Sequence, residues 1–126
     1  MPTDLTVSLE NRPGTLADLG EALGSAGLNI DAFAGFGLGE AGVAHVLVSD
    51  AGKAKAALEG AGIKVASVTE ALSVTLPDEP GALGAHARKL ASAGVNIEAS
   101  YVGKSGPGGV EVVFVVDDLA KARSAG

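Results

Sequence analysis

Apolar and polar residues alternate at the start of the chain and then change to a helical spacing. The alternation covers residues 4–10 and predicts a half-buried strand. Over residues 15–26 the apolar residues recur at the spacing of one helical face, and Gly27 is placed to end that helix. The first half then continues with predicted strands over residues 28–36, 43–49 and 63–68 and a helix over residues 53–60, with a Gly-rich turn (Gly37, Gly39 and Gly42) before the third strand.

The second half begins the same order again. It has a predicted strand over residues 72–76, a helix that ends at Ala93 with Leu83, Ala87 and Leu90 on one side, strands over residues 95–102 and 110–116 joined by a Gly/Pro-rich loop (103–109), and a short helix over residues 117–125. A βαββαβ order with right-handed crossovers predicts an α+β, ferredoxin-like fold: antiparallel sheets with helices on one face. No fourth strand is predicted for the second half.

Two short signatures repeat at one offset. Pro13-Gly14 returns as Pro80-Gly81, and Asn29-Ile30 returns as Asn96-Ile97, each 67 residues later. An internal repeat of this length indicates two copies of one small unit. We therefore expect a first unit over residues 1–69 and a second over residues 70–126.

Composition narrows the classes of function. The net charge of −6, with three Phe, one Tyr and no Trp, argues against nucleic-acid binding, which normally needs a basic face or aromatic platforms. No apolar run reaches the roughly 18 residues of a membrane span, and no secretory signal is present, so we expect a cytoplasmic protein with no membrane association. The chain has no cysteine, no catalytic triad, no phosphate-binding loop and no metal-ligand spacing. We expect no enzyme activity, no metal and no cofactor.

The Pro-Gly corners suggest an anion site. A helix N-terminus presents backbone amides without intrahelical partners and a partial positive charge, and a glycine lets an anion approach them closely. A carboxylate is the natural guest. The helix dipole supplies about 0.3–2 kcal/mol, whereas micromolar affinity needs about 8 kcal/mol, so further polar groups must converge on the same point.

Asn29 and Asn96 are candidates for that role, because an amide side chain offers both a donor and an acceptor to a zwitterion. Each Asn could instead satisfy a local turn, and Asn11 and Asp78 could simply tie down their corners. We expect the two histidines, His45 and His86, to lie in the core or on the surface and to take no part in catalysis.

With these signatures the chain resembles a tandem ACT-domain protein of the small standalone kind. The segments on which this resemblance depends are Glu10–Leu16 with Gly27–Ile30, and Pro77–Leu83 with Gly94–Ile97. The resemblance implies units that pair through their second strands into an eight-stranded sheet and bind a free amino acid at the seam between them. Serine-binding members carry a histidine at the position of Leu9, so serine is not the implied ligand.

The resemblance also implies which residues hold the ligand. Asn11, Gly14 and Leu16 of one unit would act with Asn96 of the other. The mirror site would use Asp78, Gly81 and Leu83 with Asn29, and the charge of Asp78 makes the two sites unequal. The candidate ligand-binding residues are Asn11, Pro13, Gly14, Thr15, Leu16, Asn29, Ile30, Asp78, Pro80, Gly81, Ala82, Leu83, Asn96 and Ile97.

Two functions remain open. The chain is either a non-catalytic regulatory protein that binds an amino acid, or a ligand-free pairing module that acts on a partner protein. Each half is small for an independent core, and the predicted strand over residues 110–116 is apolar on both faces, so we expect a homodimer under either function.

Overall fold

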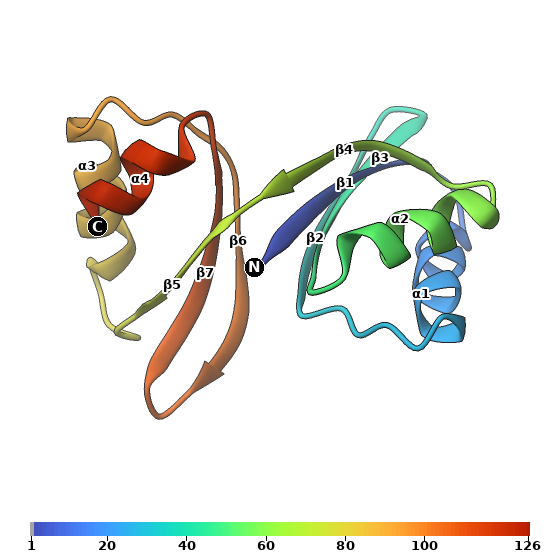
Figure 1. The fold of residues 1–126 in the computed structure, drawn as a ribbon, viewed down its shortest axis with the longest axis horizontal. Helices are drawn as coiled ribbons and strands as arrows, with labels where there is room; N and C mark the ends of the chain where they lie inside the picture. The colour runs from blue at the N-terminus through green and yellow to red at the C-terminus, as the bar shows by residue number, and fades with distance from the viewer. Residues whose placement is uncertain (1) are drawn as a thin grey trace. The chain divides into compact units, whose positions relative to one another are not determined.

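The computed structural model describes residues 2–126, which divide between Thr69 and Glu70 into two units. Each unit is an antiparallel β-sheet with two α-helices (Figure 1). The predicted α+β class and ferredoxin-like order of elements are confirmed. Within the described part of the chain, no helix is both long enough and apolar enough to cross a membrane.

The first unit has the complete βαββαβ order. Its elements are β1 (Thr3–Glu10), α1 (Thr15–Ser25), β2 (Ala32–Leu38), β3 (Ala41–Val48), α2 (Ala51–Gly60) and β4 (Lys64–Glu70). The strands lie in the order β2-β3-β1-β4, so β2 and β4 form the edges of the sheet. Leu5 of β1 and Phe33 of β2 both lie opposite Val46 of β3, which places the three residues on one face.

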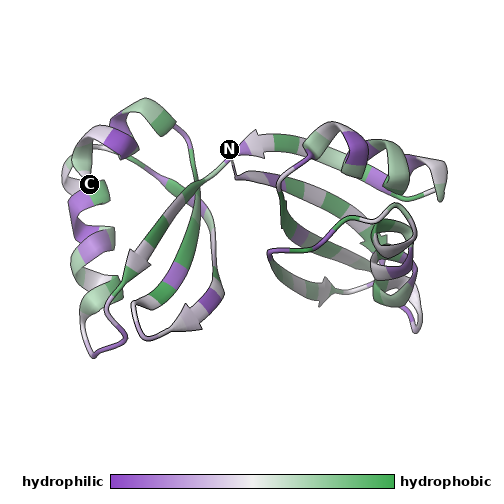
Figure 2. Ribbon diagram, turned by 60° about the horizontal axis from the view of Figure 1, so that its bottom comes forward, coloured by the Kyte–Doolittle hydropathy of each residue, from purple (hydrophilic) through white to green (hydrophobic). Residues whose placement is uncertain are grey.

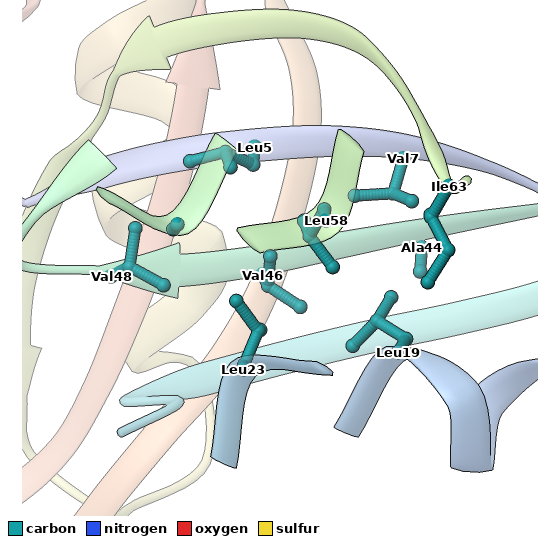
Figure 3. Close-up of a cluster of buried hydrophobic side chains, with 10 residues drawn as sticks. Leu5, Val7, Leu19, Leu23, Ala44, Val46, Val48, Leu58 and Ile63 are labelled. Atoms are coloured by element: carbon teal, nitrogen blue, oxygen red, sulfur yellow. The ribbon is translucent and has the colours of Figure 1, made fainter. Parts of the chain in front are cut away.

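The core of the first unit lies between that face and both helices (Figure 3). Alternation along β1 and β3 sends one set of side chains toward the helices, which contribute Leu19, Leu23 and Leu58. All three leucines are fully buried, and each such burial stabilises the fold by about 1.5–3 kcal/mol. The same alternation of hydrophobic and hydrophilic residues is visible along the strands in Figure 2. The helices therefore cover one face only.

The second unit follows the same plan with fewer elements. They are β5 (Leu72–Leu76), α3 (Ala82–Ser92), β6 (Ile97–Gly106), β7 (Gly109–Val116) and α4 (Leu119–Ala125), and the strand order is β5-β7-β6. The stretch from residue 63 to 76 is split at Ala71, because β4 joins the first sheet and β5 the second. Asp118 caps α4 through its side chain, as Asp50 caps α2 in the first unit.

The core of the second unit differs from that of the first at one helical position. His86 of α3 is buried where α1 has Leu19. Leu83, predicted to share one side of the helix with Ala87 and Leu90, is 55% exposed. Leu83 belongs to the first turn of α3, and Leu16 is exposed at the same point of α1.

The strand boundaries also correct the predicted ones. The strand expected from residue 28 begins at Ala32, because Leu28 still bonds back to the helix through Leu23. Gly37 and Gly42, assigned to a turn, pair with each other across the β2–β3 hairpin. Likewise most of the loop predicted over residues 103–109 is strand, since β6 runs to Gly106 and β7 begins at Gly109. Both hairpins are longer than their glycines suggest.

Candidate functional site

The corner between β1 and α1 carries the first Pro-Gly signature. Gly14 directly precedes the helix, and its φ of 93° lies in the left-handed region, which glycine adopts without a steric cost. No side chain caps the helix, and within residues 2–126 the amides of Leu16 and Ala17 donate no hydrogen bond. The N–H groups of these two residues point out of the first turn, where an anion can accept hydrogen bonds from them.

A cavity of about 350 Å³ lies beside this corner. Its volume falls within the roughly 300–1,000 Å³ of small-molecule sites. The first turn of α1 forms part of its wall, and the hairpin of β2 and β3 forms another part. The residues that line it are Leu9, Glu10, Asn11, Arg12, Gly14, Thr15, Leu16, Ala17, Phe33, Gly35, Phe36, Gly37, Gly42, Val43 and Ala44. Of the residues predicted for the first corner, the structure brings Asn11, Gly14, Thr15 and Leu16 together, and Pro13 does not line the cavity.

Asn11 ties the corner to the hairpin. Its Nδ2 donates to the carbonyl oxygen of Gly39 at 2.8 Å, and its backbone amide donates to the carbonyl oxygen of Glu40 at 2.9 Å. A Cβ on Gly37 would overlap the Asn11 side-chain amide, so glycine at that position makes room for it. The Oδ1 atom of Asn11 accepts no hydrogen bond from the described residues. Asn11 therefore has a structural role and a spare acceptor.

Glu10 and Arg12 are the ionisable side chains that line the cavity. Arg12 Nε donates to Glu10 Oε2 at 2.6 Å, and both side chains are largely exposed. The hydrogen bond from Arg12 to Glu10 and the negative charge of Glu10 raise the pKa of Arg12 above its ordinary value. Each charge is thus already balanced by the other. Thr15 is committed in a similar way, because its Oγ1 donates to the carbonyl oxygen of Arg12 at 3.2 Å.

Phe33, Gly35 and Gly37 of β2 were not predicted as site residues. They lie on the same face of the edge strand as the core residues of β3, at the register positions opposite Val46, Ala44 and Gly42. A signal was present in the repeat, because the residues 67 positions later are Ser100, Val102 and Lys104. The second copy has neither the two glycines nor the aromatic residue. This difference between the repeats could have pointed to the strand over residues 32–38.

The repeated Asn-Ile pairs lie just before β2 and at the beginning of β6, away from the Pro-Gly corner of their own units. Asn29 Nδ2 donates to Asp31 Oδ1 at 2.9 Å, which is the local contact we gave as the alternative. The backbone amide of Asn96 donates to Asp117 Oδ1 at 2.9 Å. Ile30 and Ile97 pack against the cores of their units. A ligand contact by any of these four residues stays a prediction.

The second corner repeats the backbone of the first. Gly81 has a φ of 87° and precedes α3 without a side-chain cap, while Pro80 and Leu83 are exposed and Ala82 packs partly on the core. Its edge strand is different. Val102 stands opposite Val112, the register position of Gly35, and is 59% exposed. Asp78 replaces Asn11, so the corner carries a negative charge that opposes a carboxylate.

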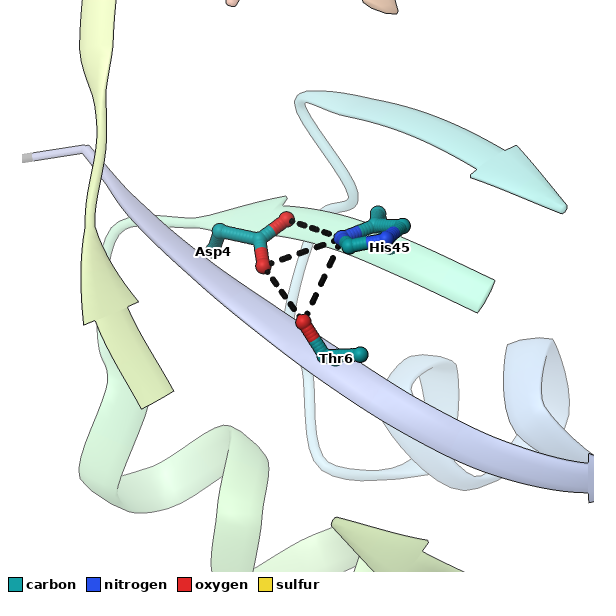
Figure 4. A network of polar contacts seen from close by, with 3 residues as sticks. All are labelled: Asp4, Thr6 and His45. Atoms are coloured by element: carbon teal, nitrogen blue, oxygen red, sulfur yellow. Dashed lines mark hydrogen bonds and ion pairs between the residues drawn. The ribbon is translucent and has the colours of Figure 1, made fainter. Parts of the chain in front are cut away.

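A buried polar cluster on β1 and β3 does not form a catalytic triad (Figure 4). His45 Nδ1 lies 3.1 Å from both carboxylate oxygens of Asp4, and Thr6 Oγ1 donates to Asp4 Oδ2 at 2.9 Å. Thr6 Oγ1 is also 3.3 Å from the same Nδ1 atom. A triad needs the acid and the nucleophile on opposite nitrogens of the ring. In this cluster Asp4 and Thr6 both contact Nδ1 of His45, so the three residues do not have the geometry of a triad.

Comparisons with known proteins relate the chain to one domain family. A family model described as an ACT domain pair matches residues 2–125. No curated protein sequence matches the chain. Among solved structures, a protein from Bacteroides thetaiotaomicron superposes with a TM-score of 0.86 at 28% identity, over 98% of this chain and 84% of that one.

Two further structures are regulatory subunits of aspartate kinase. The ligand-free form from Thermus thermophilus has a TM-score of 0.75 at 20% identity and covers 98% of this chain and 87% of its own. The subunit from Thermus flavus has a TM-score of 0.68 at 20% identity and covers 98% of this chain and 90% of its own. At these identities the two structures show that the fold is shared.

Proposed function

Because the chain belongs to the ACT-domain family as a pair of such domains, we propose that it is a non-catalytic regulatory protein that binds a free amino acid. ACT domains are typically regulatory modules of this kind, and regulatory subunits of aspartate kinase share the fold. The ligand would bind at the corner of the first unit, where the cavity lies. The single observation that carries this proposal is the pair of unpartnered amides, those of Leu16 and Ala17, at the wall of a cavity of ligand size.

The energetics define what the site must supply. A carboxylate accepting from both amides would gain about 1.5–3 kcal/mol for each bond, and the helix dipole would add up to about 2 kcal/mol. Asn11 Oδ1 can accept a hydrogen bond from the ligand's ammonium group. Micromolar affinity needs about 8 kcal/mol, and ordering of the ligand subtracts from these gains, so burial of the ligand side chain must contribute as well.

We further propose that a paired unit, in the same chain or in a second copy, covers the cavity. In this arrangement Asn96 would reach the ligand held at the first corner, and Asn29 would stand at the second. The edge strand β2 exposes Phe36 and Leu38, the latter by 75%, and pairing would remove this apolar surface from water. If the covering unit belongs to a second copy, light scattering should give the mass of a dimer, and a monomer at every concentration would contradict self-association.

A panel of the common amino acids in a thermal-denaturation assay tests the proposal. At a concentration about 100 times Kd, a ligand that binds only the folded protein adds about 2.7 kcal/mol to the unfolding free energy. We expect at least one amino acid to raise Tm in a concentration-dependent way. If none does, the amino-acid proposal fails.

The ligand-free pairing module is favoured by one specific observation. Asn11 Nδ2 and Asn29 Nδ2 both donate within the first unit, to Gly39 and Asp31. A pure scaffold would use these side chains in this way and would leave the amides of α1 to water. It predicts a protein whose Tm responds to no amino acid, so the amino-acid panel is the measurement that separates the two functions.

A further inference from the structure

We infer that the ligand of the first corner is an amino acid with an apolar side chain, and that the fold of the edge strand β2 leaves the space for it. The inference rests on the proposed function and narrows it to a ligand class. It concerns the part of the cavity that faces β2, away from the amides that would hold the carboxylate. Those amides are common to every amino acid and do not discriminate among side chains.

The walls of this part are apolar. Leu16 of α1 and Phe33 of β2 both line the cavity, and they are 53% and 55% exposed. Ala44 of β3, on the same face of the sheet, also lines it. Large apolar side chains left half in water around a concave site gain free energy when another apolar group covers them. A polar or charged side chain in the same place would be desolvated without a partner.

The polar side chains at the cavity already have partners within the first unit. Glu10 and Arg12 form an ion pair at 2.6 Å, which leaves neither charge unbalanced for a charged ligand side chain. The hydroxyl of Thr15 donates to the carbonyl oxygen of Arg12. Asn11 Nδ2 donates to Gly39, and Asn11 Oδ1 is left as an acceptor that a ligand ammonium group would use. Nothing in this arrangement selects an acidic, basic or hydroxyl side chain.

The space itself comes from Gly35. The backbone does not require glycine there, since its φ lies outside the left-handed region. A Cβ at this position would meet the Val43 carbonyl oxygen at 3.6 Å and Ala44 Cβ at 3.9 Å, both ordinary contacts. The sheet would therefore accept a larger residue, and the second unit has Val102 at the same register. A side chain on residue 35 would project from the face that lines the cavity and reduce its volume.

Three isosteric ligands provide a sharp test: leucine, asparagine and aspartate differ in polarity but hardly in shape. Titration calorimetry with the full chain should show leucine binding between about tenfold and a hundredfold more tightly than asparagine, as the transfer of one such side chain implies. Tighter binding of asparagine or aspartate would overturn the apolar inference while the proposed function stands. Binding of none of the common amino acids would overturn both.

A variant tests the space. In Gly35→Val, we expect the affinity for leucine and phenylalanine to fall by at least about tenfold, with a smaller loss for alanine and no loss of Tm in the ligand-free protein. The matched control is Val102→Gly, the reverse exchange at the equivalent position of the second unit, which should leave leucine affinity unchanged. An equal loss for large and small ligands in Gly35→Val would contradict a steric role for residue 35.

Discussion

His86 lies flat against Phe114 in the core of the second unit, with ring centroids 5.4 Å apart and ring planes at 30°. Its Nε2 atom is buried and has no hydrogen-bond partner among the described residues. The first unit has Leu19 at the same position of its first helix. Burial and the nearby charge of Lys89 lower the pKa of His86 below its ordinary value of 6.5. One core thus contains an imidazole where the other contains a hydrocarbon.

We expect acid to destabilise the second unit through His86. Above about pH 6.5 the imidazole is neutral in both the folded and the unfolded state, so it adds no pH dependence. Below that value the unfolded chain binds a proton that the folded chain does not, because the folded pKa is lower. The unfolding free energy therefore falls as the pH falls from about 6.5 toward the folded pKa. Urea unfolding followed by circular dichroism at a series of pH values measures this effect.

His86→Leu is the matched variant, since it copies Leu19. It should raise the stability at neutral pH by about 1–3 kcal/mol, because it removes an unsatisfied buried polar atom. It should also reduce the slope of stability against pH below about 6.5. His45 stays in place in this variant and controls for the other histidine. An unchanged slope would show that His86 does not carry the pH dependence.

The paired glycines at the two corners allow a controlled test of the ligand site. Gly14→Ala and Gly81→Ala both force a Cβ into the left-handed region, and each should cost about 1–2 kcal/mol of stability. The space around both positions is open, so strain is the whole effect. Only Gly14→Ala should also weaken amino-acid binding, since Gly14 lines the cavity. Ligand-induced Tm shifts for the two variants check this, and equal shifts would argue against the first corner as the site.

Asn11 and Gly37 should show a strong energetic coupling. A Cβ on Gly37 overlaps the Asn11 side chain, which must then give up its hydrogen bond to Gly39. Gly37→Ala should therefore cost about 1 kcal/mol. In an Asn11→Ala background the clash is absent, and the cost of Gly37→Ala should fall to near zero or reverse, since alanine suits a strand interior better than glycine.

A double-mutant cycle from urea unfolding measures this coupling, which we expect to be about 1 kcal/mol. Gly35→Ala is the control, because a Cβ there has ordinary room. A cost of Gly37→Ala that is the same with and without the Asn11 side chain would mean that the hairpin, and not Asn11, requires the glycine.

Much of the fold could be predicted from the sequence, because its signals are local. Alternation over β1, the helical spacing of Leu19 and Leu23, and the glycines that precede and follow the helices each depend on neighbours a few residues away. The hairpins were predicted too short because their extent depends on contacts with residues far away in the sequence. Gly37 suggests a turn when only its neighbours are considered, but it is a strand residue that makes room for Asn11, a residue of another element.

The candidate site was predicted only in part. The resemblance to ACT-domain proteins implies the corner residues Asn11, Gly14 and Leu16, and the structure places them around one cavity. The opposite wall could not be predicted in the same way. Phe33 and Gly35 face α1 only because β2 pairs with β3 in one particular register, and alternation over a short Gly-rich strand does not determine a register.

We expect one ligand for each chain, bound at the first corner. The two corners share the open helix N-terminus, but the second has Val102 where the first has Gly35 and Asp78 where the first has Asn11. The valine takes the space of an apolar ligand side chain, and the carboxylate of Asp78 repels that of the ligand. Titration calorimetry with the amino acid that gives the largest Tm shift should therefore yield a stoichiometry near one. In the double variant Asp78→Asn with Val102→Gly the stoichiometry should rise toward two, while Asp78→Asn alone should leave it near one because Val102 still fills the space. Two equivalent sites in the unmodified chain would show that neither Val102 nor Asp78 closes the second corner.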